Sequence, residues 1–566
     1  MTHRPATSHA RRDHSRAQLS RLLAAAVWLG THAAAQAADT TETLTYVLTP
    51  QFERGRLRVE LSWETGQRRR STLRVASRWG RIDDVTQFLH GLVFSGGTAR
   101  QDGPMWILTH TPGANVSCTY EVYAGRRAFD DWDYTHHPLT TPEFFHGMGN
   151  AFLLAPNPGD DAPEEYEVVL RWQLPAGFKA ACSWGVGRSV GARLKAGDIR
   201  QSVYLAGRLA THTMPQEGRS VTVAMVDAFG FTPEQLAQMT TAIIKQQCTF
   251  MDERAFPDFV ATAIPVGQPL KPGDSRLAGS GLYNSFALCL APQSKLSDAV
   301  EHLFAHELFH YWNGRLLAAA DPERLVCWFT EGLTDYYALR VLFESGRWDA
   351  ATYARWINKH VREYHLNPAI HASNEDINRD YWNQRDTVGE VAYQRGLMLG
   401  LRWHKLARQN DVPDGLDRLF QTLVRRGRER GLKLTNAAIR DAGVELLGAW
   451  FGPEFDRYIN QAATVELPAD VLAPKLVGKS TDVYTFELGF DRASSLKDKK
   501  VRGLVRGSAA QAAGLRERDL LAGWSIPADP DQPVRLQVQR GGETQTIEYY
   551  PRGRKASVTQ FAPAGD

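Results

Sequence analysis

The sequence predicts a multidomain α+β protein, and three observations along the chain support this prediction. Residues 41–226 contain short runs of alternating apolar and polar residues separated by Gly, Pro, Asp and Asn, which is typical of an antiparallel β-domain. Residues 321–465 show the longer apolar spacing of amphipathic helices, and the pattern changes again at Leu467-Pro468. At 566 residues with 43% hydrophobic content, the chain is long enough for about three domains with full cores.

The first 37 residues carry the pattern of an export signal. Basic residues such as Arg16 and Arg21 precede the apolar run Leu22–Leu29, and the small-x-small triplet Ala35-Gln36-Ala37 follows. We therefore expect residues 1–37 to be a signal peptide and the mature protein to be exported, either periplasmic or secreted. An apolar core of about nine residues is too short to cross a bilayer, and no later run approaches the roughly 20 apolar residues of a membrane helix. The sequence thus predicts no membrane span.

Charge and cysteine content exclude two further classes of protein. Removing residues 1–37 takes away five Arg and one Asp, so the formal net charge falls from +3 to −1. The mature chain shows no basic stripe with interleaved aromatic residues, so nucleic acid is not expected as a partner. Five cysteines are too few for a disulfide scaffold at this length, although a bridge between Cys118 and Cys182 stays open.

A second domain is expected to begin at residue 230. Thr232 as N-cap, Pro233 at the first helical position and Gln235 at the third predict a helix that reaches about Phe250. Strands are then expected near residues 256–264 and 283–290, and the main helices at residues 328–343, 349–364, 388–408 and 416–426. A small sheet beside a mostly helical domain follows from this order.

The chemistry of the chain centres on His306-Glu-Leu-Phe-His310, a His-Glu-x-x-His motif inside a predicted amphipathic helix. Residues i and i+4 of a helix lie on one face, so the imidazoles of His306 and His310 can bind a single Zn²⁺. Glu307 then lies beside the open position of such a site. The alternative is a helix whose histidines are satisfied within the fold, and the residues downstream of the motif argue against it.

Residues at both ends of this helix predict its limits. Ser297 is the expected N-cap, and Asn313-Gly314 supplies the left-handed conformation that ends helices. His302 lies one turn before His306 on the same face, yet a straight helix spreads three such imidazoles too far apart for one ion. We interpret His302 as a structural or rim residue.

A catalytic zinc site needs a third protein ligand and leaves its fourth position to water. Glu331, in Trp328-Phe-Thr-Glu331-Gly-Leu-Thr-Asp335, lies 21 positions after His310 and is the expected third ligand. Asp335 lies one turn beyond Glu331, where it can accept the second imidazole N–H of a ligating histidine and fix its tautomer. Ordinary helix residues are the alternative interpretation for both carboxylates.

The C-terminal part of the chain resembles a PDZ domain. Leu488-Gly489-Phe490 is followed by a run over residues 501–521 that contains Ala-Gly514-Leu and ends in x-x-x-Asp519-Leu-Leu. The resemblance implies a groove that accepts an extended strand or a C-terminal carboxylate, so a peptide ligand of this domain is a possible partner. A vestigial packing module is the alternative.

The segment His306-Glu-Leu-Phe-His-Tyr-Trp-Asn-Gly-Arg315, with Trp328–Tyr337 after it, resembles the glycyl aminopeptidase family of PDZ-bearing zinc metallopeptidases, within the thermolysin-like group. The resemblance implies one Zn²⁺ per chain on His306, His310 and Glu331, with Glu307 as general base. It also implies four segments after the signal peptide: an N-terminal β-domain (38–229), a thermolysin-like zinc peptidase domain (230–466), a PDZ domain (467–552) and a tail (553–566).

A further element, Ala392-Tyr393-Gln-Arg-Gly396, resembles the Tyr-x-Lys-Gly element of related zinc aminopeptidases. There a tyrosine hydroxyl stabilises the oxyanion, which implies this role for Tyr393; a core aromatic is the alternative. The resemblance implies an exported enzyme that hydrolyses peptide substrates with metal-activated water, Glu307 taking the proton. The competing hypothesis is a non-catalytic or chaperone-like protein that binds peptides through its PDZ domain.

The sequence departs from the family at the strand beside the metal. Family members carry a Gly-Gly-x-Glu-His element there, whose glutamate is well placed to pair with a substrate's α-amino group. This chain has Gly279-Ser-Gly-Leu-Tyr-Asn-Ser-Phe286, with neither Glu nor His. An ammonium group that enters a partly desolvated cleft needs a compensating carboxylate. We therefore predict weaker dependence on a free N-terminus than in a strict glycyl aminopeptidase, unless a residue such as Glu390 substitutes.

Overall fold

The computed structural model describes the chain from residue 41 to residue 565, with gaps at residues 81, 124–134, 158–164, 255 and 271–275. The expected signal peptide, residues 1–37, lies outside the described residues. Among the helices that the structure describes, none is both long enough and apolar enough to cross a membrane.

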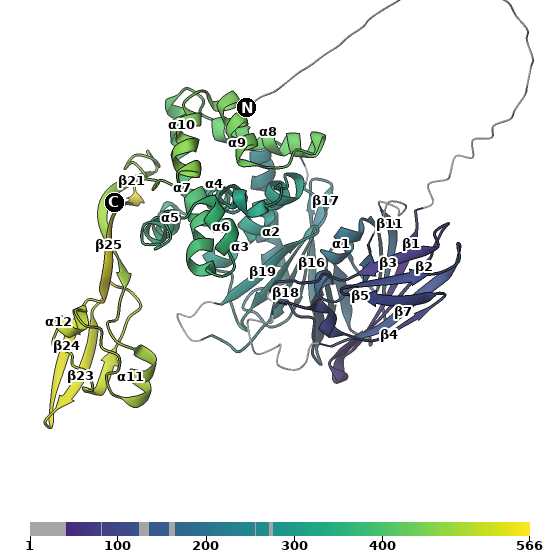
Figure 1. Cartoon of the computed structure of the whole chain (residues 1–566), viewed down its shortest axis with the longest axis horizontal. Helices are drawn as coiled ribbons and strands as arrows, with labels where there is room; N and C mark the ends of the chain where they lie inside the picture. Colours follow the sequence, from purple (N-terminus) through teal and green to yellow (C-terminus); the bar gives the residue numbers. More distant parts are fainter. Residues whose placement is uncertain are drawn as a thin grey trace, which may run out of the picture. The chain divides into compact units, whose positions relative to one another are not determined.

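Short strands form three sheets in the N-terminal region (Figure 1). A six-stranded sheet has the spatial order β14 (Ser189–Leu194), β11 (Tyr166–Trp172), β1 (Thr43–Gln51), β2 (Arg56–Glu64), β7 (Asn115–Val122), β4 (Leu89–Ser95). A four-stranded sheet has the order β10 (Ala155–Pro156), β3 (Arg70–Arg74), β6 (Met105–Thr109), β5 (Thr98–Asp102). A five-stranded sheet has the order β13 (Gly185–Val186), β12 (Lys179–Cys182), β15 (Val203–Gly207), β9 (Phe144–Met148), β8 (Leu139–Thr140).

Alternation of buried and exposed residues along β1 and β2 explains why these segments form strands that bury one face. The strand pairs are antiparallel as expected, with one exception, since β1 pairs with β11 in parallel, Thr43 opposite Glu167. Cys118 and Cys182 are both buried free thiols, so the structure contains no bridge between them. A short helix, α1 (Ala196–Arg200), follows β14.

A fourth sheet lies beside the motif helix, with the order β16 (Leu209–Gln216), β17 (Arg219–Val226), β18 (Phe259–Pro265), β20 (Ser285–Leu290), β19 (Leu277–Leu282). The inner pairs β17–β18 and β18–β20 are parallel, whereas β19 pairs antiparallel with β20 and forms the edge. The sheet therefore takes strands from both sides of residue 230. β18 and β20 are buried along their whole length, which matches the continuous apolar runs of buried strands.

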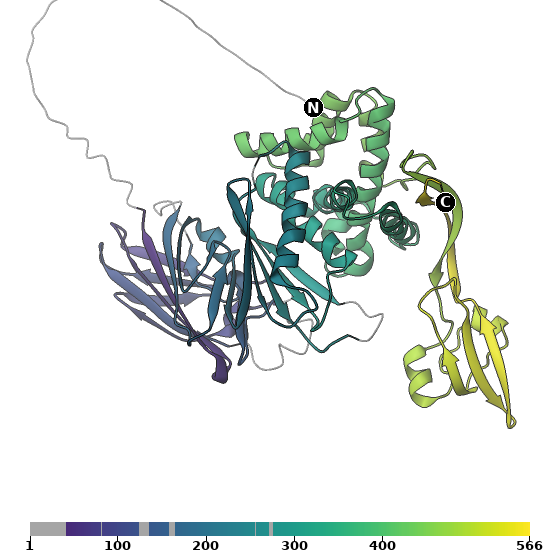
Figure 2. The same cartoon turned by 180° about the vertical axis from the view of Figure 1, so that it is seen from behind.

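Helices cover this sheet and form the rest of the central region (Figure 2): α2 (Pro233–Met251), α3 (Asp298–Phe309), α4 (Thr334–Glu344), α5 (Ala350–His365), α6 (Asn374–Asp380), α7 (Glu390–Gln409), α8 (Gly415–Arg430), α9 (Asn436–Leu447) and α10 (Phe451–Phe455). The predicted start of α2 is confirmed, because Thr232 Oγ1 accepts from Gln235 N and Gln235 Oε1 from Thr232 N. The core contains Trp312, Trp328 and Trp403, each at most 1% exposed.

The C-terminal module spans β21 to β25 and contains two further sheets. Its elements are β21 (Leu476–Phe486), α11 (Arg492–Asp498), α12 (Ala509–Ala512), β22 (Leu520–Ser525), β23 (Val534–Arg540), β24 (Glu543–Tyr549) and β25 (Arg552–Pro563). β21 pairs with β25, and β22, β23 and β24 form a three-stranded sheet. Residues expected as a tail, 553–566, thus include most of β25. Asn358 of α5 holds this strand, since its side chain donates to Phe561 O at 2.8 Å and accepts from Phe561 N at 2.7 Å.

The segment that resembles a PDZ loop lies in the core of this module. Leu488 and Phe490 are less than 10% exposed and pack with Val501, Leu521 and Leu536. The helices of the module, α11 and α12, are seven and four residues long. Through residues 476–563, all of which the structure describes, no longer helix lies beside a strand to form the second wall of a peptide groove.

Candidate active site

α3 presents the motif histidines from a helix that is capped as predicted. Ser297 Oγ accepts from Val300 N at 3.4 Å, and the side of the helix that carries Phe304 and Leu308 is buried against the sheet and its neighbours. His306 Nε2 and His310 Nε2 lie 3.0 Å apart. One helix therefore brings the two imidazoles to a single point, as the i, i+4 spacing predicts.

The end of α3 differs from the prediction in one respect. The helix ends at Phe309 and a π-helical turn, Tyr311–Leu316, follows, in which Asn313 has φ −100° and ψ 71° instead of a left-handed conformation. The side chain of Asn313 explains this, because its amide nitrogen donates to Phe329 O at 2.8 Å and to Thr334 Oγ1 at 3.0 Å. Asn313 thereby ties the end of α3 to the segment that carries the predicted third ligand.

Glu331 lies in a π-helical turn, Trp328–Leu333, directly before α4. Its Oε2 is 3.3 Å from His306 Nε2 and 3.5 Å from His310 Nε2. The turn is held close to α7 by two glycines, since a Cβ on Gly332 would lie 2.5 Å from Gly396 Cα. Larger residues at this contact would push α7 and its Tyr393 away from Glu331.

The outer nitrogens of both imidazoles point to hydrogen-bond acceptors. His306 Nδ1 lies 2.8 Å from Asp335 Oδ1, and His310 Nδ1 lies 3.1 Å from Asn313 O. With Nδ1–H as donor in each ring, both Nε2 atoms carry lone pairs and cannot hydrogen-bond each other. Two facing lone pairs at 3.0 Å are what a shared cation requires.

The spacing of the three donors fits a zinc ion. Ligands about 2.0–2.2 Å from a tetrahedral Zn²⁺ lie roughly 3.3–3.6 Å from one another. The observed separations of 3.0, 3.3 and 3.5 Å among His306, His310 and Glu331 are close to these values. Two imidazoles and one carboxylate are also a donor set of catalytic zinc sites.

Electrostatics support the same interpretation. Burial lowers the pKa of His306, but the Asp335 and Glu331 carboxylates outweigh burial and raise this pKa well above its ordinary value. Burial alone would raise the pKa of Glu331, yet the two histidines hold it below its ordinary range. The pocket therefore attracts positive charge, and a cation that binds there displaces protons from the ligands.

Glu307, the predicted general base, lies beside the edge strand. Its Oε2 accepts a hydrogen bond from Gly281 N at 2.9 Å, and a Cβ on Gly281 would lie 2.6 Å from the same oxygen. A larger residue at position 281 would therefore displace the Glu307 carboxylate from this contact. The motif gave no indication of this contact, because it joins residues far apart in the sequence.

Tyr393, on α7, stacks its ring on His306 at 6.1 Å between ring centroids. Its hydroxyl lies 3.2 Å from the hydroxyl of Tyr381, a partner that the sequence did not indicate. Burial and the Glu331 carboxylate raise the pKa of Tyr393 above its ordinary value. The hydroxyl is thus protonated at neutral pH and able to donate a hydrogen bond.

A cavity of about 390 Å³, the small cavity, lies beside these groups. Glu307, His310 and Glu331 line it together with the residues that follow β19. The N-terminal region also reaches it, since Asp198 and Gln201 are part of its wall. The small cavity is therefore bounded by both the catalytic helix and the N-terminal region.

The edge strand lacks the glutamate of the family element, but a different element supplies a carboxylate to the small cavity. Asp198 adds a carboxylate from α1, with Arg315 close enough to lower its pKa, although burial raises that pKa on balance. Glu390, which could have replaced the missing glutamate, lines a different cavity and is paired with Arg385 at 2.5 Å.

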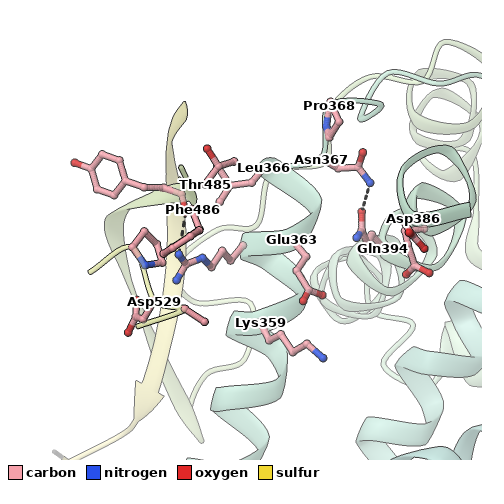
Figure 3. Close-up of a pocket in the computed structure, with 15 residues that line it drawn as sticks. Lys359, Glu363, Leu366, Asn367, Pro368, Asp386, Gln394, Thr485, Phe486 and Asp529 are labelled. Atoms are coloured by element: carbon pink, nitrogen blue, oxygen red, sulfur yellow. Dashed lines mark hydrogen bonds between the residues drawn. The ribbon is translucent and has the colours of Figure 1, made fainter. Parts of the chain in front are cut away.

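That second cavity, the large cavity, has a volume of about 810 Å³. It lies between α5, α7 and the C-terminal module, and Figure 3 shows Lys359 and Glu363 of α5 with Phe486 and Asp529 of the module among its lining residues. Asn367 donates to Gln394 Oε1 at 3.0 Å in its wall (Figure 3). None of the three predicted metal ligands lines it.

The structure thus brings all six predicted residues of the site together from three helices and the turns beside them. His306 and Glu307 come from α3 and His310 from its C-terminal cap, Glu331 and Asp335 from the turn and start of α4, and Tyr393 from α7.

The sequence model of the M61 glycyl aminopeptidase family matches residues 299–399, the segment from α3 into α7. No curated protein sequence matches the chain.

Among solved structures, an aminopeptidase N family protein from Idiomarina loihiensis is similar with a TM-score of 0.69 at 16% identity, covering 92% of this chain and 98% of that one. An M1 zinc metallopeptidase mutant from Deinococcus radiodurans, bound to a Tyr-Ser-Ala substrate, gives a TM-score of 0.48 at 15% identity, covering 76% and 95%. The first likeness shows a shared fold over nearly the whole described chain. The match to the M61 family model supports a metallopeptidase.

Proposed function

We propose that the chain is an exported, zinc-dependent aminopeptidase. The observation that carries this proposal is the arrangement of His306, His310 and Glu331, whose facing atoms are 3.0–3.5 Å apart with Glu307 next to His306 in the chain. A Zn²⁺ held by these three residues would polarise the scissile carbonyl and acidify a water molecule.

The residues around the donors have distinct tasks in this proposal. Glu307 accepts a proton from the attacking water and passes it to the leaving amine. Tyr393 donates a hydrogen bond to the oxygen on which negative charge develops. Asp335 holds His306 in the tautomer whose Nε2 is free for the metal.

The edge strand β19 can pair with an extended peptide substrate, and antiparallel pairing sets the direction of that peptide. An extended peptide that adds antiparallel to β19 brings its N-terminal residues toward the end of this strand at Leu282. There Tyr283 N donates to Gln201 O at 2.6 Å, so the N-terminal region closes the end of the strand. A substrate with few residues before the scissile bond fits this arrangement, which favours an aminopeptidase over an endopeptidase.

The test of the proposal is metal content together with cleavage of a short peptide. We expect purified protein to contain zinc and to lose peptidase activity on dialysis against a chelator, with recovery when Zn²⁺ is added back. A folded protein that contains no zinc and cleaves no peptide would support the non-catalytic, peptide-binding alternative instead.

Export and the C-terminal module belong to the same proposal. The basic, apolar and small-residue pattern of residues 1–37 supports export, and N-terminal sequencing of the mature protein is expected to begin at residue 38. We assign the C-terminal module to a PDZ-like fold that assists longer peptides. Its helices, α11 and α12, are seven and four residues long and too short to form the long second wall of a peptide-binding groove of the usual kind.

A further inference from the structure

A second group of metal-ligating side chains lies behind the proposed zinc site. His302 of α3, Asp335 of α4 and His360 of α5 each offer a ligand atom, and these atoms all lie within 4.8 Å of one another. We call this group the Asp335 cluster. Three different helices supply it, so its assembly is a property of the folded domain and not of one sequence motif.

Two nitrogens in this cluster have no hydrogen-bond partner among the described residues. His302 Nε2 and His360 Nε2 are both inaccessible to solvent and unpaired, and His360 is only 8% exposed. His302 Nε2 lies 3.2 Å from Asp335 Oδ1, but without the direction that a hydrogen bond needs. Buried polar atoms are rarely left unpaired in native proteins, so a partner is expected for these nitrogens.

The distance between His302 Nε2 and Asp335 Oδ1 matches that between two ligands of one ion. Zn²⁺ ligands at about 2.0–2.2 Å in tetrahedral geometry lie roughly 3.3–3.6 Å apart, close to the 3.2 Å between His302 Nε2 and Asp335 Oδ1. Two imidazoles and a carboxylate also repeat the donor set of His306, His310 and Glu331. An ionised carboxylate has about four acceptor positions, so Asp335 can accept from His306 Nδ1 and still bind a cation.

We propose that His302, Asp335 and His360 bind a second divalent cation, with Zn²⁺ as the best-fitting ion. The ring of Trp356 packs on His302 at 4.5 Å between ring centroids. No carboxylate other than Asp335 belongs to the cluster, and a general base such as Glu307 is absent from it. The second cation is therefore structural or regulatory in effect, not catalytic.

The two cations would be coupled through Asp335. A cation on this carboxylate withdraws negative charge from the oxygen that orients His306, so His306 becomes a weaker donor to the first ion. Coupling of this kind is reciprocal, since each ion then weakens the binding of the other by the same factor. We expect the second ion to bind more weakly than the first and to lower peptidase activity as it binds.

The experiment counts metal ions per chain in the full mature protein. Protein incubated with excess Zn²⁺ and freed of unbound ion is analysed by elemental mass spectrometry, and a parallel titration with Co²⁺ follows the visible absorption. We expect two equivalents in the wild type and one in His360→Leu, which keeps a similar volume but removes a donor. His310→Ala is expected to lose the first ion and keep the second.

A matched control is His146→Leu. His146 is also fully buried with both ring nitrogens unpaired among the described residues, but it lies on β9 in the N-terminal region, outside both donor groups. This variant should keep two equivalents, which separates a metal effect from the general loss of a buried histidine.

The wild-type count decides between the two proposals. A wild-type protein without bound zinc would contradict the proposed function. One equivalent that saturates the Co²⁺ spectrum would leave the proposed function intact and overturn the second site. Two equivalents would support both proposals. If His360→Leu does not fold, the wild-type titration still decides, and His302→Gln gives a second variant. Two equivalents that persist in every folded variant of the Asp335 cluster would overturn the assignment of its ligands.

Discussion

The large cavity of about 810 Å³ has roughly twice the volume of the small cavity of about 390 Å³, but the proposed chemistry lies in the small one. Glu307, His310 and Glu331 line the small cavity, and His310 Nε2 lies 3.5 Å from Glu331 Oε2. In the large cavity the charged groups serve as structural ties, such as Arg362, which donates to Tyr484 O at 2.9 Å. Convergence of metal-ligating atoms, rather than volume, distinguishes the proposed active site of this molecule.

This comparison predicts that substitutions at the small cavity have large effects on metal binding and peptide hydrolysis, and that changes at the large cavity have small effects on both. The largest effect is expected from Glu307→Gln, which keeps the volume and removes the base. We expect a loss of at least about two orders of magnitude in kcat, the usual contribution of a general base. Zinc content measured on the same sample should stay at the wild-type level. Turnover near the wild-type rate would contradict the assigned role of Glu307.

Removal of a metal ligand should act through the metal itself. Glu331→Ala takes away one of three protein donors to the proposed zinc, so zinc should be lost on dialysis under conditions where the wild type retains it. Glu323→Ala is a suitable control, because this residue is exposed and, among the described residues, forms an ion pair only with Arg324, one position away. If Glu331→Ala keeps zinc with unchanged affinity, another group must be the third ligand.

Asp335→Asn tests the residue that orients a ligand without contacting the first ion. The amide keeps the size of the side chain but removes its charge, and His306 loses the partner that fixes its tautomer. Changes of this kind typically cost about 10–100-fold in metal affinity. Competition with a chromogenic chelator measures this loss, and unchanged affinity would mean that Asp335 does not support His306.

The sequence predicted some features of this site from local patterns and gave no indication of others. The helix α3, its cap at Ser297 and the i, i+4 histidines follow from local rules of capping and periodicity. The contact of Gly281 with Glu307 and the hydrogen bonds of Asn313 join segments 16 or more residues apart, so no local pattern announces them. Local signals thus predicted which residues matter, and only the fold showed what holds them.

The same distinction between local patterns and long-range contacts explains where the structure differs from the predicted fold. The parallel pairing of β1 with β11 joins strands more than 100 residues apart, and alternation alone does not reveal strand direction. α6 is short and polar, so its apolar period is too weak to predict, although Ser373 and Asp376 form a capping box. The PDZ-like loop was recognised as a motif, but Leu488 and Phe490 belong to the core of the module.

A moderate effect is expected from acetylation of a substrate. The edge strand carries no carboxylate for an α-amino group, and Asp198, which lines the small cavity, is partly balanced by Arg315. We therefore predict that kcat/KM falls by less than about tenfold between a tripeptide and its N-acetylated form. A fall of a hundredfold or more, about 2.7 kcal/mol, would show that the free amine is strongly recognised. Asp198→Asn would then be the first variant to test.

The smallest effect is expected from the module that lines the large cavity. Its distal part has its own core around Val501 and Leu536, whereas Val483 of β21 and Phe561 of β25 belong to the core of the central region. Phe486 and Arg552 are paired residues of these two strands, so an Asn-Gly turn in place of residues 487–551 would keep the strands as a hairpin.

This hairpin variant removes Asp529 from the large cavity but no residue of the small one. Zinc content and kcat/KM for a tripeptide should therefore stay within about twofold of the wild type, because distant and independent sites contribute separately. Peptides of about ten residues should show the larger loss if the module assists them. A truncation at Val465 is the informative contrast, because it also removes Val483 and Phe561 and is expected to destabilise the central region. Loss of tripeptide cleavage in a folded hairpin variant would mean that the distal module helps to shape the small cavity.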